Sequence, residues 1–321
     1  MTNELTIVVP VYGVEEYLAK CLDSLLCQSV DNYQILVIND GSKDNSQSII
    51  DEYQNKYPNK VKGYIKENGG LSDARNYGLK YVGTPYVMFI DADDYVEKDM
   101  VETCLKAIKQ DLDIVVFSYY QHYVANNSFE VINLKIKEGI YNPKENPEII
   151  AYTPNAAWNK IYKTSLFKEN NIIYPKGLLY EDLGTTPILL AKSLKVGYIN
   201  KALYHYLVDR PNNITKQVDK RIFDVIKIME NNVKYFKDNN LYETYNQELH
   251  YLYKINTIEN MRKAMKSKDK KLTIDYIEKV FDVEKKLFDS SILKYNIELN
   301  GSDIIYKNKS LAKMYYRFKS K

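Results

Sequence analysis

The stretch "LTIVVPVYGVEEYLAKCLDSLLCQSVDNYQILVI", residues 5–38, carries the fold signal, because two short apolar runs flank a helical pattern. The runs at 5–9 and 33–38 are almost continuously apolar, which is typical of strands that are covered on both faces. Between them, apolar or aromatic residues recur at helical spacing, at Tyr17, Leu18, Cys21, Leu22, Leu25 and Leu26. A strand, a helix and a strand in this order favour an α/β domain.

The same alternation of strand and helix patterns continues to about residue 120. Further strand candidates lie at 61–65, 86–90 and 113–117, and a second helical stripe consists of Met100, Val101, Cys104, Leu105 and Ile108. This alternation predicts a doubly wound α/β domain with a mostly parallel central sheet. Ligands of such sheets bind beyond the carboxyl ends of the strands, which here are followed by Pro10–Tyr12, Asn39–Ser42 and Asp91–Asp94.

The length of the chain, 321 residues, is sufficient for about two domains. We predict the α/β domain over residues 1–215 and a helical C-terminal module over residues 216–321. The first helix of the module is indicated by an apolar stripe at Ile222, Val225, Ile226, Met229 and Val233. Such a module could bind the acceptor of a reaction, a membrane or a second subunit of a homo-oligomer.

The last segment, residues 307–321, combines six Lys or Arg residues with apolar and aromatic residues and has no acid. A cationic amphipathic segment of this kind can lie on anionic lipid, which would place the protein at the inner face of the plasma membrane. The alternative is a solvated last helix whose aromatic residues pack on the module. The sequence leaves both alternatives open.

Composition excludes several classes of protein. The formal net charge is +3, from 45 Lys and Arg against 42 Asp and Glu, so no overall field indicates a nucleic-acid partner. Mean hydropathy is −0.45, and no apolar stretch reaches the length of a membrane span. The N-terminus does not read as a signal peptide. Cys21 and Cys104 lie in apolar helical stripes and are expected in the core, so we predict a cytoplasmic chain.

The motif "FIDADDYV" places Asp91, Asp93 and Asp94 directly after the strand candidate 86–90. Two carboxylates with one residue between them, such as Asp91 and Asp93, can bind one hard cation. Mg²⁺ or Mn²⁺ in such sites is commonly bound by carboxylates and by substrate phosphates together. The alternative is an acidic turn that caps a helix starting near Val96. Asp94 could be such a cap while Asp91 and Asp93 bind metal.

Two further motifs follow strand candidates. In "VINDGSKDNS", Asp40 at the end of a strand can accept from a nucleobase N–H, although the same residues also form ordinary turns. In "ENGGLSDARNYGL", Gly69 and Gly70 let the backbone approach a ligand closely. The N-terminus of the helix that follows is suited to bind a phosphate or a carboxylate. Arg75, one turn into that helix, could reach the ligand or an Asp.

A last motif, "YEDLG", sets Glu181 beside Asp182 at the start of a predicted helix. If the fold brings the pair near Asp93, one of the two carboxylates could be a general base. The alternative is that the two acids only stabilise the N-terminus of the helix, where negative charge interacts favourably with the helix dipole.

Taken in their order along the chain, the opening stretch and these four motifs resemble the motifs of family 2 glycosyltransferases with the GT-A fold, over roughly residues 4–215. The resemblance implies inverting, metal-dependent transfer of a hexose or N-acetylhexosamine, with Mn²⁺ or Mg²⁺ and a donor that is most simply a UDP-sugar. The acceptor implied is a hydroxyl of a cell-surface glycan, such as a polysaccharide repeat, a teichoic acid or a protein-linked glycan, and it can be lipid-linked. The alternatives are a sugar-nucleotide nucleotidyltransferase, whose Gly-rich loop is missing after the first strand, and a non-catalytic nucleotide-sugar-binding module.

The resemblance also implies roles for single residues. On the donor side, the nucleobase would be held by Pro10, Val11, Tyr12 and Asp40, with Gly70 in the glycine-rich turn and Arg75 in the uridine pocket. Ribose and metal would be bound by Asp91, Ala92 and Asp93. The diphosphate would be contacted by Arg210. Asp182 would be the catalytic base, with Glu181 as a sugar or acceptor contact. His205 could be a third metal ligand or a structural residue. Trp158 could be a platform for a sugar face or a core residue.

Overall fold

The computed structural model describes residues 3–208, 218–288, 293–297 and 308–319. The chain divides into two compact units, of which the first holds Met1–Gly177 and Thr185–Asn212 and the second Leu178–Gly184 and Asn213–Lys321. The predicted boundary at residues 215 and 216 lies outside the described residues, so it stays a prediction. Arg210, the proposed diphosphate contact, also lies outside them.

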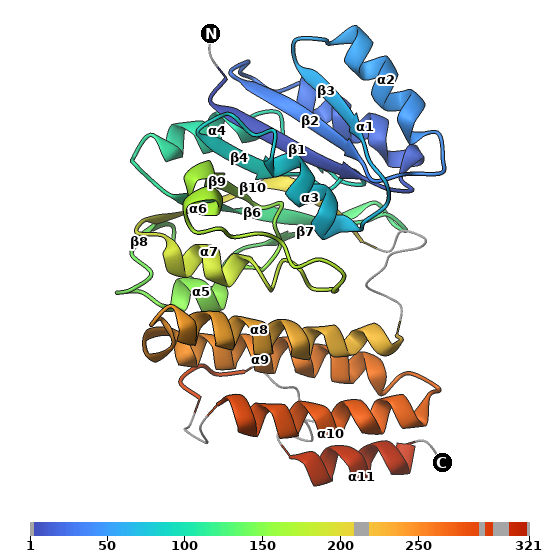
Figure 1. The fold of residues 1–321 in the computed structure, drawn as a ribbon, viewed down its shortest axis with the longest axis vertical. Coiled ribbons are helices and arrows are strands. Elements are labelled where there is room, and N and C mark those ends of the chain that lie inside the picture. The colour runs from blue at the N-terminus through green and yellow to red at the C-terminus, as the bar shows by residue number, and fades with distance from the viewer. Residues whose placement is uncertain (1–2, 209–217, 289–292, 298–307, 320–321) are drawn as a thin grey trace. The chain divides into compact units, whose positions relative to one another are not determined.

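The first unit contains a 10-stranded sheet (Figure 1). Its strands, in spatial order, are β3 (Val61–Ile65), β2 (Tyr33–Asn39), β1 (Leu5–Val11), β4 (Tyr86–Phe89), β9 (Lys160–Lys163), β6 (Ile114–Tyr123), β10 (Val196–Val208) and β5 (Tyr95–Val96), with β7 (Ser128–Ile132) on β6 and β8 (Gly139–Tyr141) on β10. Strands β1, β2, β3, β4, β6 and β10 run in one direction and the others run in the opposite direction. The predicted α/β class with a mostly parallel sheet is confirmed.

Helices cover both faces of this sheet, as the doubly wound prediction requires. On one face, Ile7 and Val9 belong to a core cluster with residues of α1 (Glu15–Leu26), α2 (Ser46–Lys56) and α4 (Met100–Ile108). On the other face, Val8 lies under α3 (Leu71–Leu79), where Gly78 allows close packing. Cys21 and Cys104 are buried, as predicted for core residues.

The chain after β6 builds the middle of the sheet in a way that the strand pattern did not predict. Strand β9 lies between β4 and β6 and is antiparallel to both. Three short helices accompany this part of the chain: α5 (Glu148–Tyr152), α6 (Thr164–Glu169) and α7 (Thr186–Lys192). The reversed direction of β9 brings its first residue opposite Val116, close to the carboxyl end of β4.

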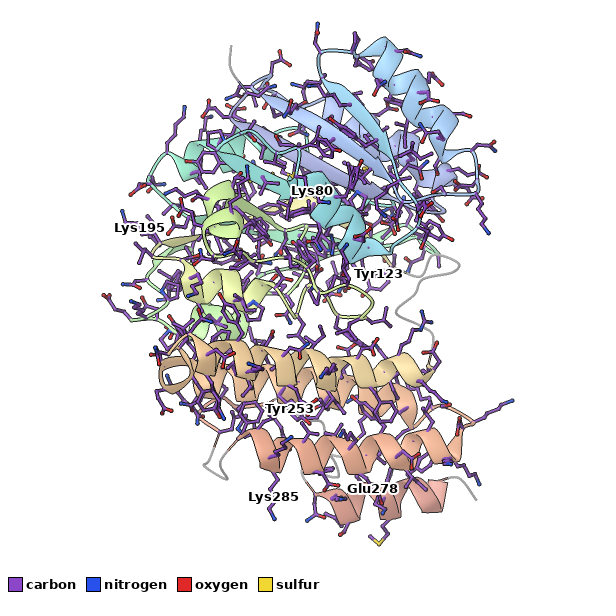
Figure 2. All side chains as sticks on the ribbon, in the orientation of Figure 1. Lys80, Tyr123, Lys195, Tyr253, Glu278 and Lys285 are labelled. Carbon is purple, nitrogen blue, oxygen red and sulfur yellow. The ribbon has the colours of Figure 1, made fainter. Side chains whose placement is uncertain are left out.

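The second unit is helical, as predicted. Its elements are the 3-10 helix η2 (Lys220–Phe223), α8 (Asp224–Asp238), α9 (Tyr242–Ala264), α10 (Lys270–Leu287) and α11 (Lys309–Lys319). Side chains join the helices: the hydroxyl of Tyr253 on α9, labelled in Figure 2, donates to the carbonyl of Val280 on α10 at 2.6 Å. Among the described residues, none of the helices combines the length and the apolar character needed to cross a bilayer.

Candidate active site

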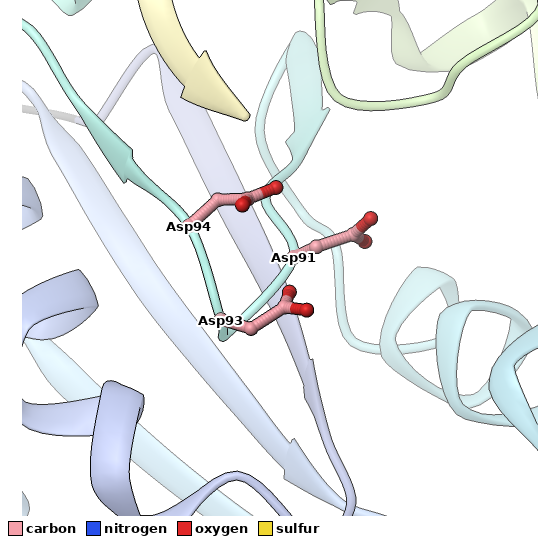
Figure 3. A group of neighbouring side chains, drawn as sticks. All are labelled: Asp91, Asp93 and Asp94. Atoms are coloured by element: carbon pink, nitrogen blue, oxygen red, sulfur yellow. The ribbon is translucent and has the colours of Figure 1, made fainter. Parts of the chain in front are cut away.

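A turn with three aspartates connects β4 to β5 at the carboxyl edge of the sheet (Figure 3). Asp91, Asp93 and Asp94 offer carboxylate oxygens that all lie within 4.8 Å of one another. Adjacent carboxylates repel one another unless a cation lies among them. Carboxylate oxygens are the ligands that Mg²⁺ and Mn²⁺ prefer, so the side chains at this turn fit a divalent ion.

The environment of Asp94 differs from that of the other two aspartates. Its carboxylate accepts from the Tyr204 hydroxyl at 2.6 Å and from the Leu207 backbone N–H at 2.8 Å, both on β10. Only 2% of Asp94 is exposed. Burial, followed by the charges of Asp93 and Asp91, raises its pKa well above the ordinary range of an aspartate. Asp94 therefore anchors the turn to the yellow strand of Figure 3.

The alternative in which Asp94 caps a helix that starts near Val96 is wrong. After the turn the chain forms the short strand β5, which pairs with β10, and α4 starts only at Met100 with Asp99 at its N-cap position. The physical reason is that pairing with β10 satisfies the backbone of Tyr95 and Val96, so no helix begins there.

Asp91 is held by Arg75. The guanidinium donates to the Asp91 carboxylate at 2.9 Å, and the Arg75 side chain is buried while that of Asp91 is partly exposed. The guanidinium also lies 5.3 Å from the ring centre of Tyr174. Of the two alternatives for Arg75, contact with an Asp is confirmed. Because the pair leaves Asp91 at the edge of the site in a fixed position, Asp91 remains suited to bind a cation.

Asp40 follows β2 and holds the glycine-rich loop. Its buried carboxylate accepts from the backbone N–H groups of Gly69 at 3.0 Å and Gly70 at 2.7 Å, and it also pairs with Lys66. Lys66 reaches Asp73 on α3 at 2.6 Å as well. Gly70 has a φ of 85°, in the left-handed region that favours glycine. Asp40 thus fixes the loop, and its contact with a nucleobase stays a prediction.

The Pro10–Tyr12 segment ends β1 at the same edge of the sheet. Pro10 and Val11 are buried, and the carbonyl of Val11 accepts from the N–H of Asp40 at 2.9 Å. Tyr12 is 53% exposed, so its ring is available to stack on a planar ligand. Ala92 is buried in the core cluster and contributes packing.

His205 is packed between aromatic rings. Its imidazole stacks on Tyr95 at 4.2 Å and on Tyr120 at 4.6 Å between ring centres, and its Nε2 lies 2.7 Å from a carboxylate oxygen of Glu97. Burial lowers the pKa of His205, although the hydrogen bond to Glu97 acts in the opposite direction. In the part of the chain that the structure describes, the one group of acids suited to a metal does not include His205. These contacts favour the structural alternative.

Trp158 is likewise a packed residue. The indole is 7% exposed, belongs to the core cluster and stacks on Tyr204 at 4.3 Å and on Tyr206 at 5.4 Å. Little of the ring is left for a sugar face, so the core alternative is favoured. Through Tyr204, the indole instead supports the residue that holds Asp94.

Glu181 and Asp182 belong to the second unit rather than to the sheet. They lie in a turn that precedes α7, and both are partly buried. The expectation that they begin a helix is wrong by a few residues, since α7 starts at Thr186. Two functional candidates were not predicted: Lys66, which the end of its strand could have indicated, and Tyr204, for which the sequence carries no signal.

Comparison with known proteins gives the family. The model of "Glycosyl transferase family 2" matches residues 6–169. Glycosyltransferase GlyA of Streptococcus pneumoniae is 37% identical over 219 residues, which are 64% of this chain and 31% of GlyA. The putative glycosyltransferase EpsH of Bacillus subtilis is 30% identical over 258 residues, which are 77% of this chain and 73% of EpsH. The match thus spans about a third of GlyA and nearly three quarters of EpsH.

Solved structures give the same fold. The crystal structure of Staphylococcus aureus TarS 1–349 superposes with a TM-score of 0.72 at 21% identity, over 99% of this chain and 92% of that chain. This likeness supports the GT-A architecture and, at that identity, the fold alone. The family model covers more than half of the residues, and four of the five motifs lie within the matched range. The chain therefore belongs to glycosyl transferase family 2.

Proposed function

We propose that this protein is an inverting, metal-dependent glycosyltransferase that moves a hexose or N-acetylhexosamine from a UDP-sugar to a hydroxyl of a cell-surface glycan. The observation that carries the proposal is the turn in which the carboxylates of Asp91, Asp93 and Asp94 lie together, with Asp91 paired to the buried Arg75 and Asp94 anchored to β10. TarS has been crystallised with UDP-GlcNAc, and a mannosyltransferase of Pyrobaculum calidifontis with GDP-Man and Mn²⁺. The relative GgaB of Bacillus subtilis is named a minor teichoic acid biosynthesis protein, which supports an acceptor of that class.

The chemistry follows from the residues. Asp93 and Asp91 would hold Mn²⁺ or Mg²⁺, while Arg75 fixes Asp91 and β10 fixes the turn through Asp94. When bound, the ion supplies positive charge to the departing diphosphate. The bond from the anomeric carbon to the diphosphate breaks as the acceptor oxygen bonds from the opposite face. The acceptor proton passes to the Asp182 carboxylate, which would act as general base.

The decisive experiment is nucleotide release. The protein is incubated with Mn²⁺ and a panel of UDP- and GDP-sugars, and we expect UDP to accumulate with at least one UDP-sugar and EDTA to stop the release. Asp93→Asn should abolish the metal-dependent rate, because one of the two proposed ligands loses its charge. Glu52→Gln is the control, since Glu52 is an exposed acid on α2.

The outcomes separate the candidate functions. Release that continues in EDTA, or at the wild-type rate in Asp93→Asn, would contradict the metal site. A nucleotidyltransferase would instead release pyrophosphate from a nucleoside triphosphate and a sugar phosphate. A binding module would bind UDP without turning over any donor.

We also propose that α11 contacts anionic lipid. Ala312 and Tyr316 are buried, whereas Leu311 is 40% and Met314 is 51% exposed, so this helix has an uncovered apolar side. Lys313 pairs with Glu278 of α10, which is labelled in Figure 2. An apolar face with adjacent cations suits the interface of an anionic bilayer.

Sedimentation with vesicles that contain phosphatidylglycerol tests this contact. The wild-type protein should pellet with them, and the double variant Leu311→Ser with Met314→Ser should pellet less. Neutral phosphatidylcholine vesicles are the control for charge. Equal pelleting of both proteins would show that α11 does not make the contact.

A further inference from the structure

The segment that carries Asp182 is built into the helical unit by three hydrogen bonds. The backbone N–H of Leu179 donates to the carboxylate of Asp224 at 3.0 Å, and the side-chain amide of Asn232 donates to the carbonyl of Leu183 at 2.8 Å. Both acceptor and donor side chains lie on α8. The third bond runs from the Tyr180 hydroxyl to the side-chain oxygen of Asn260 on α9 at 2.9 Å. The bonded residues of the segment, Leu179, Tyr180 and Leu183, thus lie on both sides of Asp182 in the sequence.

The backbone of the segment needs this support. Tyr180 has a φ of 65°, which is uncommon for a residue other than glycine and persists only where the surroundings determine it. Its carbonyl accepts from the N–H of Gly184 at 3.1 Å, which closes the turn around Glu181 and Asp182. Asn232 and Asn260 are buried, so their bonds to the segment are shielded from water. Burial also raises the pKa of Tyr180 to about 12, so its hydroxyl stays a donor.

We infer that the helical unit positions the catalytic base, and that Asp224, Asn232 and Asn260 are positioning residues for Asp182. The inference rests on the proposed function, in which Asp182 takes the acceptor proton. Proton transfer requires the base within about 3 Å of the hydroxyl. A displacement of about 1 Å can cost about 10²-fold in rate. The helical unit is therefore part of the catalytic apparatus and not only a docking module.

Asn232→Ala removes the donor to Leu183, and Asn231→Ala is its matched control, because Asn231 is the exposed neighbour on the same helix. The readouts are kcat and KM for UDP release from the donor that turns over, and the Kd of UDP in Mn²⁺. We expect kcat of Asn232→Ala to fall about 10- to 100-fold with unchanged Kd of UDP. Asn231→Ala should match the wild type in every readout.

A conservative pair separates positioning from a general loss of stability. Asp224→Asn keeps a side-chain oxygen that can accept from Leu179, whereas Asp224→Ala does not. We expect Asp224→Asn to retain most of kcat and Asp224→Ala to lose it, with both proteins equally folded by circular dichroism. Tyr180→Phe, which loses only the hydroxyl bond to Asn260, extends the test should Asn232→Ala fail to fold.

The outcomes distinguish this inference from the proposed function. If Asp182→Asn is inactive while folded Asn232→Ala, Asp224→Ala and Tyr180→Phe all keep the wild-type kcat, the positioning role is overturned and the base assignment stands. If Asp182→Asn itself keeps the wild-type kcat, the base assignment fails, and the positioning inference fails with it.

Discussion

Two aspartates of the turn after β4, Asp94 and Asp91, have different partners. Asp94 is enclosed by β10, where Tyr204 and Leu207 both donate to it. Asp91 forms an ion pair with Arg75. A buried carboxylate with two donors is stabilised where it is, so Asp94 is poorly placed to exchange these bonds for a metal. The two partly exposed acids, Asp91 and Asp93, are consequently the better candidates for the proposed metal ligands, and the buried Asp94 holds the turn in place.

At the same scale, Asp182→Asn should separate chemistry from binding. The amide has nearly the same shape as the carboxylate but cannot accept a proton at neutral pH. General base catalysis is typically worth about 10²–10⁴-fold, so we expect kcat for sugar transfer to fall by that factor while the Kd of UDP stays unchanged. The measurement is single-turnover transfer beside UDP titration in Mn²⁺.

Glu181→Gln is the matched variant, since it removes the neighbouring charge in the same turn. We expect its main effect in KM for the acceptor, as a sugar or acceptor contact would give. A kcat loss in Glu181→Gln with none in Asp182→Asn would move the base to Glu181.

At the scale of elements, α3 can pack closely on the sheet because Gly78 has no side chain. A Cβ added to Gly78 would lie 2.5 Å from a methyl carbon of Val8 and 3.3 Å from a side-chain carbon of Ile38. Overpacking of this kind typically costs about 1–3 kcal/mol, so Gly78→Ala should lower the free energy of unfolding by that amount.

The measurement for Gly78→Ala is urea denaturation, with Gly83→Ala as the control. At Gly83 no atom lies within 4 Å of the added Cβ. Because Arg75 is on the same helix, Gly78→Ala should also weaken UDP binding in Mn²⁺, whereas Gly83→Ala should not. Equal stability of the two variants would show that α3 can move away from the sheet without cost.

The elements also show where sequence patterns stop being informative. Asp40, Asp91 and Asp93 could be placed at the site because each follows directly on an apolar strand, and the ends of parallel strands share an edge. The partner of Asp94 could not be placed, since Tyr204 is 110 residues further along the chain and contacts over such distances leave no periodic signal. Trp158 and His205 were ambiguous for a related reason: whether an aromatic ring is covered depends on the strands that pair around it.

At the scale of the whole molecule, the residues with proposed roles fall into two units. The Asp turn, Arg75 and the glycine loop belong to the first unit, and the proposed base belongs to the second. The family model ends at residue 169, before the "YED" segment. The sequence could identify Asp182 as a candidate base through the family resemblance. The hydrogen bonds that tie its segment to α8 and α9 come from residues 40–80 positions away, and no local sequence pattern predicts such contacts.

The division into units makes one residue a selective probe of donor binding. Trp158 is the single tryptophan of the chain and is buried in the core cluster of the first unit. Its fluorescence, excited at the red edge of the absorption band to avoid the tyrosines, therefore reports the unfolding of that unit. Far-UV circular dichroism reports the helices of both units.

We expect UDP with Mn²⁺ to raise the midpoint temperature of the thermal unfolding transition that Trp158 fluorescence reports. A ligand at about 100 times its Kd stabilises the native state by about 2.7 kcal/mol, which corresponds to about 5–10 °C for a unit of this size. EDTA should remove the metal-dependent part of the shift, and so should Asp93→Asn, because Asp93 is a proposed ligand. A shift of the same size in EDTA would mean that the Asp turn binds no metal with the donor, since the nucleotide alone would then account for all of the stabilisation.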